Sequence, residues 1–71
     1  MKIKINGNHE EIEGKPNITE LLAIKNVEMP DMVSVEHNGN ILKRSDFEAV
    51  RLNENDSIEF LYFMGGGDVI R

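Results

Sequence analysis

The sequence predicts a small α+β domain in which a single helix packs across one face of a β-sheet. Three observations support this: apolar and polar residues alternate with period two near both ends of the chain, two Asn-Gly pairs suit hairpin turns, and only one stretch has helical periodicity. The expected order of elements is β-β-α-β-β-β. Because one helix supplies one apolar stripe, we expect the other face of the sheet to be largely solvated.

The amino-terminal segment is predicted to form a β-hairpin. Isoleucine alternates with lysine over residues 2–6, which is typical of a half-buried strand. Asn6 and Gly7 follow, and both residue types tolerate the positive φ angles of a tight turn. A second short strand is expected over residues 10–13, around Ile12.

The helix is predicted to begin after Asn17. Its side chain can accept a hydrogen bond from the backbone amide three residues on, and Glu20 stands where it can reciprocate, as in a capping box. Three aliphatic residues then lie on one face at helical spacing: Ile18, Leu21 and Leu22. The next position on that face is Lys25, so we expect a helix of about two to three turns that ends near residue 25 or 26.

A second hairpin is predicted in the middle of the chain. Residues 32–37 alternate between apolar and polar side chains, with Val33 and Val35 on one face. Asn38-Gly39 is the best two-residue hairpin signal in the sequence, and residues 40–43 return from it.

The last strand is predicted to carry a glycine tail. Before it, a single helical turn is expected to pack Phe47 and Val50 inward, and residues 53–56 form a polar turn. The strand-forming run Ile58–Met64 then continues, with no polar turn, into Gly65-Gly66-Gly67.

Alternation along this strand predicts an apolar patch at the root of the tail. If residues 58, 60 and 62 face the core, Leu61 and Phe63 face outward beside Met64. One interpretation is a docking surface for another protein. The other is that the end of a twisted central strand is covered on both sides, and the sequence leaves both open.

Composition excludes several classes of function. The chain has no cysteine, which removes disulfides, thiolate metal sites and a cysteine nucleophile. A net charge of −5 argues against nucleic acid as a partner. No stretch approaches a membrane span or a secretion signal, so we expect a cytoplasmic chain. His9 and His37 are not placed together, so no metal site is predicted, and without a cluster of reactive side chains the chain is not expected to be an enzyme.

The glycine tail itself has two interpretations. It could be a frayed chain end. Alternatively, because glycine lacks Cβ, the tail could lie extended in a narrow channel of another protein, where a terminal carboxyl group could be activated by adenylation. It is not a phosphate-binding loop, since neither the lysine-threonine pattern nor a helix follows it.

The segment from Asn55 to Gly67, with the Asn38-Gly39 hairpin and Arg44, resembles the ThiS-type sulfur carrier proteins, which are related to the small subunit of molybdopterin synthase. The resemblance covers residues 1 to 67 and implies the ubiquitin-like β-grasp fold, with a mixed sheet and one main helix across one face. It divides the chain into a β-grasp domain, 1–64, and a flexible glycine-rich tail, 65–71.

The resemblance also implies a chemistry for the tail. In this family a ubiquitin-activating-like adenylyltransferase uses ATP to adenylate the terminal glycine carboxylate, which then becomes a thiocarboxylate. Aligned from Asp56, the family's diglycine falls on Gly66 and Gly67, with Gly65 before it, so Gly67 would carry the sulfur. The acceptor is typically thiazole synthase of thiamine biosynthesis. The carrier itself is expected to bind no cofactor, since the ATP is used by the partner. It is also expected to be a monomer, because a carrier must dock with successive partners.

The chain departs from the family pattern after the diglycine, where Asp68 to Arg71 follow. We therefore expect a processing peptidase to cleave after Gly67 before activation. The extension could instead be an expression artefact, or the chain could be a carrier for the homocysteine/methionine or molybdopterin route. A further alternative is a non-covalent ubiquitin-like binding module that docks through Leu61 and Phe63 while its tail is inert.

Overall fold

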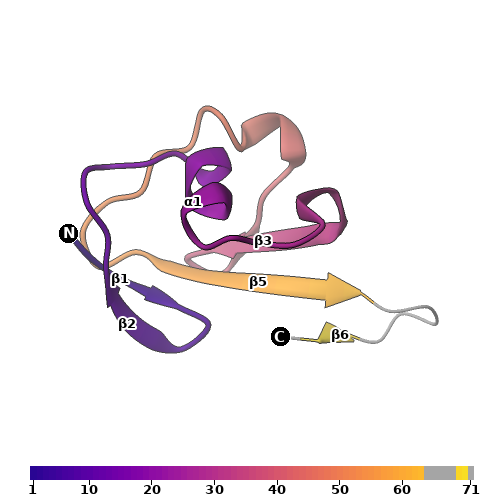
Figure 1. The fold of residues 1–71 in the computed structure, drawn as a ribbon, viewed down its shortest axis with the longest axis horizontal. Coiled ribbons are helices and arrows are strands. Elements are labelled where there is room, and N and C mark those ends of the chain that lie inside the picture. Colours follow the sequence, from indigo (N-terminus) through magenta and orange to yellow (C-terminus); the bar gives the residue numbers. More distant parts are fainter. Residues whose placement is uncertain (64–68, 71) are drawn as a thin grey trace.

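The computed structural model describes residues 1–63 and 69–70, and it has the predicted order of elements with short additions. The elements are β1 (Lys2–Ile5), β2 (Asn8–Glu11), α1 (Ile18–Ile24), the 3₁₀ turn η1 (Pro30–Met32), β3 (Val33–His37), β4 (Asn40–Ile41), the 3₁₀ turn η2 (Arg44–Asp46), β5 (Ser57–Phe63) and β6 (Val69–Ile70). The sheet runs in the order β2-β1-β5-β3-β4, and β6 also pairs with β5. Strands β1 and β5 are parallel and the other pairs antiparallel, which makes the sheet mixed as predicted. Helix α1 crosses one face of this sheet (Figure 1).

Both Asn-Gly hairpins form as predicted. Asn6 and Gly7 have φ angles of 50° and 86°, and Asn38 and Gly39 have 49° and 89°. Two successive positive φ angles define the type I′ turn, whose twist matches that of the flanking strands.

The second strand begins earlier than the sequence indicated. A two-residue turn pairs Ile5 directly with Asn8, so β2 starts at Asn8 and ends at Glu11 rather than spanning residues 10–13. Ile12 therefore lies beyond the strand. It is nevertheless buried, and its N–H donates to the carbonyl oxygen of Met1 at 2.9 Å.

The helix begins and ends where the sequence predicted. The Asn17 side chain accepts from the Glu20 amide at 2.8 Å, and the Glu20 carboxylate accepts from the Asn17 amide at 2.9 Å. These two bonds are the expected capping box. Lys25 caps the other end, and its ammonium group forms an ion pair with Glu10 of β2 instead of continuing the apolar stripe.

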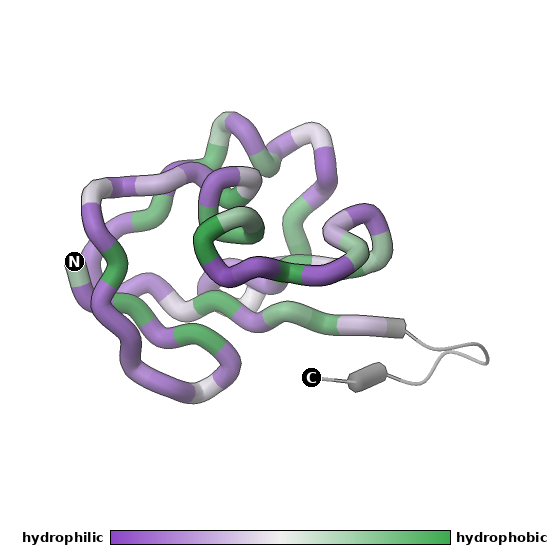
Figure 2. Tube along the Cα trace, in the orientation of Figure 1, coloured by the Kyte–Doolittle hydropathy of each residue, from purple (hydrophilic) through white to green (hydrophobic). Residues whose placement is uncertain are grey.

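The hydrophobic core lies between α1 and one face of the sheet. Apolar residues alternate with polar ones along β1 and through the first half of β5 (Figure 2). Phe47 is buried and Val50 packs partly buried against the core, as predicted for the helical turn near η2. The core cluster consists of Ile3, Ile5, Ile12, Ile18, Leu21, Leu22, Val33, Val35, Phe47, Leu52, Ile58 and Phe60.

Candidate functional site

Strand β5 is the element that carries the glycine tail, and it lies in the middle of the sheet. Its first residues run parallel to the end of β1, and Ile58 to Tyr62 pair with β3 on the other edge (Figure 1). Met64, Gly65, Gly66 and Gly67, together with the side chain of Phe63, lie outside the described residues. The site is therefore built from the strand that leads to the tail and from the surface around its end.

The base of β5 is held by the carboxylate of Asp56, whose side chain is only 12% exposed. It accepts hydrogen bonds from the ring Nε2 of His37 at 2.9 Å, from Nδ2 of Asn38 at 3.1 Å and from the backbone amide of Asn53 at 2.9 Å. The Asn38 side-chain oxygen in turn accepts from the Ser57 amide at 2.8 Å. The β3–β4 turn and the start of β5 are thus joined by side-chain hydrogen bonds.

These contacts set the charge state of Asp56. Burial alone would raise the pKa of this carboxyl group, because it disfavours the charged form. The hydrogen bonds from His37, Asn53 and Asn38 favour the carboxylate and outweigh burial, so the pKa lies below its ordinary value. Asp56 is therefore an ionised structural anchor at neutral pH.

This cluster was not predicted from the sequence, which indicated only that His37 and His9 do not form a metal site. The local part could have been found, because aspartate side chains also bond backbone groups three residues earlier, as Asp56 does with the Asn53 amide. The contact between His37 and Asp56 joins residues far apart in the chain and depends on the pairing of β3 with β5. No sequence spacing indicates it.

The structure decides between the two interpretations of Leu61, in favour of a strand end that is covered. Leu61 is 7% exposed, although it lies outside the core cluster under α1. On one edge β3 places Ser34 opposite it, and on the other edge β6 pairs with the next two residues of β5. Strands β3 and β6 thus flank this end of β5 on its two edges. The docking role of Leu61, Phe63 and Met64 stays a prediction.

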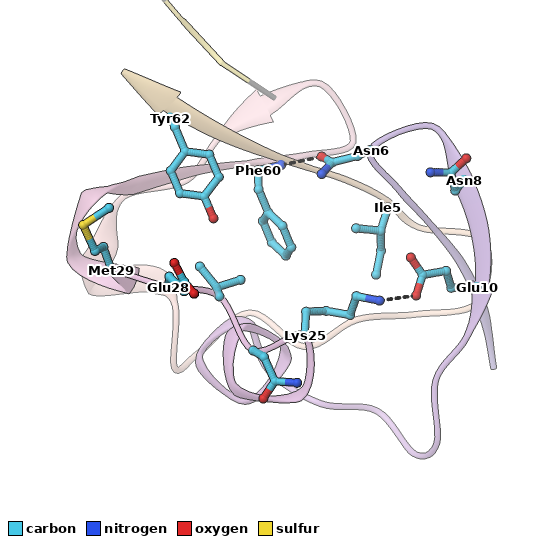
Figure 3. A pocket seen from close by; sticks show the side chains of 11 residues that line it. Ile5, Asn6, Asn8, Glu10, Lys25, Glu28, Met29, Phe60 and Tyr62 are labelled. Atoms are coloured by element: carbon cyan, nitrogen blue, oxygen red, sulfur yellow. Dashed lines mark hydrogen bonds and ion pairs between the residues drawn. The ribbon is translucent and has the colours of Figure 1, made fainter. Parts of the chain in front are cut away.

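A groove of about 430 Å³ opens on the helix side of the sheet beside the end of β5. Tyr62 and Met29 stand at one end of it, and the Lys25–Glu10 ion pair stands at the other (Figure 3). Its floor includes Phe60, whose amide donates to the Asn6 side-chain oxygen at 2.9 Å. The groove is open and partly apolar, and it adjoins the point from which the tail departs.

Within residues 1–63 and 69–70, no group of histidine, aspartate and glutamate side chains is arranged to hold a metal ion. In that same part of the chain, none of the helices has the length and apolar character needed to cross a membrane. Among the residues described, the one buried charged group is the Asp56 anchor. What the geometry offers is the end of β5, which is held in the middle of the sheet by the strands that pair with it.

The family model for ThiS matches residues 3–67, which is nearly the whole chain. The chain belongs to the ThiS family. ThiS proteins are sulfur carriers and are not catalysts themselves. The family match ends at Gly67, the residue on which the resemblance to this family predicts the sulfur.

Solved structures of ThiS proteins have the same fold. The crystal structure of the thiamine biosynthesis protein ThiS from Geobacter metallireducens superposes with a TM-score of 0.88 at 42% identity, covering 94% of this chain and all of that one. A solution structure of a thiamine biosynthesis protein from the same organism gives 0.77 at 40% identity, covering 100% of this chain and 94% of that one. The predicted β-grasp architecture is confirmed.

A curated relative of the chain is a much larger protein. A thiazole synthase from Magnetococcus marinus is 37% identical over 67 residues, which are 94% of this chain and 20% of that protein. The chain therefore spans about a fifth of the length of this relative. A ThiS-like segment is part of the same polypeptide as the remainder of that protein.

Proposed function

We propose that this chain carries sulfur as a thiocarboxylate on Gly67 and delivers it to a thiazole synthase in thiamine biosynthesis. The observation that carries the proposal is the position of Gly67. It is the last residue of the family match and lies four residues beyond the end of β5. A segment of that length, built mainly of glycine, can enter a narrow channel because it has few side chains to exclude it.

The chemistry requires a free carboxylate at Gly67. That carboxylate attacks the α-phosphorus of ATP to form an acyl adenylate and releases pyrophosphate. A hydrosulfide ion released by the sulfur donor then attacks the carbonyl carbon and displaces AMP, which leaves a thiocarboxylate and releases a proton. In this sequence the Gly67 carbonyl is part of the peptide bond to Asp68. Hydrolysis of that bond by a peptidase must therefore precede adenylation.

The thiazole route is favoured over other acceptors by the relatives. Two similar structures belong to thiamine biosynthesis proteins, and the curated relative is a thiazole synthase that contains a segment similar to this chain. Carriers of one fold can serve several acceptors, so the acceptor itself has to be tested.

The experiment uses two forms of the chain, residues 1–67 and residues 1–71. Each is incubated with the cognate adenylyltransferase, ATP and a sulfur donor, and its intact mass is measured. The 1–67 form is expected to gain the mass difference between sulfur and oxygen, and the 1–71 form should stay unchanged until a peptidase cleaves it. The carrier proposal fails if the 1–67 form never gains sulfur.

The acceptor is tested by adding the sulfur-loaded 1–67 form to thiazole synthase with its other substrates. Thiazole formation should consume the thiocarboxylate and return Gly67 to a carboxylate. Transfer to a homocysteine-forming or molybdopterin-forming enzyme in place of thiazole synthase would assign the carrier to another pathway.

A further inference from the structure

Two exposed methionines lie at the end of the sheet from which the tail departs. Met29 is 65% exposed and Met32 is 62% exposed. Met32 directly precedes Val33, the register partner of Tyr62, so it lies level with the last residues of β5. Met29 lines the groove beside Tyr62 (Figure 3). We call Met29 and Met32 the methionine rim.

The backbone of the rim is fixed rather than loose. The Arg44 guanidinium donates to three carbonyl oxygens of this segment, those of Pro30 at 2.9 Å, Asp31 at 2.5 Å and Val33 at 2.7 Å. Its charged end also lies 5.6 Å from the centre of the Phe47 ring, which anchors it to the core. One arginine thus positions the whole turn next to the end of β5.

Met29 is held in an unfavourable conformation. Its φ and ψ angles of 51° and 59° lie in the left-handed region, which residues other than glycine, asparagine and aspartate rarely adopt. Met29 is nevertheless part of an ordered turn, because the Met32 amide donates to the Met29 carbonyl oxygen at 2.9 Å. Strain in a positioned segment with exposed apolar side chains is typical of a functional contact.

The length of the tail limits how far from the methionine rim a reacting enzyme can lie. Met64 to Gly67 are four residues, which span at most about 14 Å when fully extended. An enzyme that reacts with the Gly67 carboxylate must therefore bring its active site within that distance of the end of β5. Its surface around the entrance then has to contact the residues beside that end, and the methionine rim is among them.

We propose that the methionine rim is a docking contact for the adenylyltransferase, against an apolar lip around the channel that takes up the tail. This inference rests on the proposed function, since it assumes that Gly67 is adenylated. Methionine suits such a contact because its unbranched, polarisable side chain adapts to apolar surfaces of different shape.

The test uses the double variant Met29→Gln, Met32→Gln in the 1–67 form. Glutamine has nearly the length of methionine, lacks its apolar end and also has a Cβ, so the backbone strain is the same. A matched control is the double variant Ile24→Gln, Ile41→Gln, which changes two other exposed apolar residues, 49% and 57% exposed, away from the end of β5. Thermal unfolding checks that both variants are folded.

Steady-state adenylation is measured as ATP–pyrophosphate exchange against carrier concentration. The rim variant is expected to raise the KM for the carrier roughly tenfold with kcat little changed, as expected for lost binding contacts. The control should keep the KM of the wild-type chain. An unchanged KM for the rim variant, or an equal rise for the control, would overturn the inference.

Two further outcomes separate a failure of the proposed function from a wrong choice of partner for the rim. If the wild-type 1–67 form is not adenylated at all, the proposed function fails and the rim proposal falls with it. If the rim variant is adenylated normally but delivers sulfur poorly to thiazole synthase, the rim serves the acceptor enzyme, and the assignment to the adenylyltransferase is wrong.

Discussion

Replacement of Asp56 by alanine removes the acceptor of three hydrogen bonds at the base of β5, those from His37, Asn38 and Asn53. Each bond contributes about 1 kcal/mol net, so the three together amount to about 3 kcal/mol. The free energy of unfolding of a chain of this length is about 4 to 10 kcal/mol. Asp56→Ala should therefore remove a large share of the stability of the whole domain.

The assay is urea unfolding at pH 7, followed by circular dichroism. With a slope of about 1 kcal/mol per molar urea for a small domain, the midpoint should fall by about 3 M. Asp31→Ala is the matched control, because Asp31 is an exposed aspartate whose replacement should change the free energy of unfolding by less than about 0.5 kcal/mol. Equal midpoints for the two variants would refute the role given to Asp56.

A comparison of the wild-type chain with Asp56→Ala at different pH values tests the pKa of Asp56. Its pKa is lower in the folded state than the ordinary value of 3.8, so the unfolded state takes up the proton first as the pH falls. The stabilisation is complete above the unfolded value and is lost as the pH falls from there through the folded pKa. The difference in the free energy of unfolding between wild type and Asp56→Ala should therefore shrink as the pH falls below 3.8. A difference that stays constant down to full protonation would contradict this assignment.

Three other substitutions test separate parts of the structure, each by urea unfolding. Asn17→Ala removes one half of the capping box and should cost about 1 kcal/mol. Arg44→Lys cannot reach three carbonyl oxygens at once, so it should cost about 1 kcal/mol and also raise the KM for adenylation; an unchanged KM would separate the rim from Arg44. Leu61→Gln in the full chain should cost about 2 kcal/mol, whereas Ile41→Gln at an exposed position should cost less than about 0.5 kcal/mol. Equal stability of these last two variants would mean that Leu61 is solvated after all.

Much of the fold could be predicted because its signals are local. Asn17 and Glu20 are three residues apart, so their reciprocal bonds depend only on the helix that they begin. The two Asn-Gly turns likewise depend on two residues that accept positive φ angles. The predicted start of β2 was wrong by two residues. The length of the turn, and not the position of Ile12, sets the register between β1 and β2.

The glycine tail was also indicated by the sequence, but through a family resemblance and not through a local folding signal. A strand that runs into glycines without a turn is visible without any structure, and its resemblance to ThiS proteins pointed to Gly67. The family match over residues 3–67 confirms the family, while the thiocarboxylate on Gly67 remains a proposal. The residues beside the end of β5 could not be found this way. Met29 and Tyr62 are far apart in the sequence and come together only as lining residues of the groove.

The sequence by itself determined the hairpins, the helix and its cap, and the tail that defines the family, because each depends on residues close together in the chain. Only the tertiary structure decided that Asp56 is an anchor, that Leu61 is buried and that two methionines stand at the tail's exit. The contacts of Asp56 with the β3–β4 turn and the position of Met32 depend on the pairing of β5 with β3, and Leu61 lies where β3 and β6 both flank β5. Strand pairing joins residues distant in sequence, and no local pattern records which of them will meet.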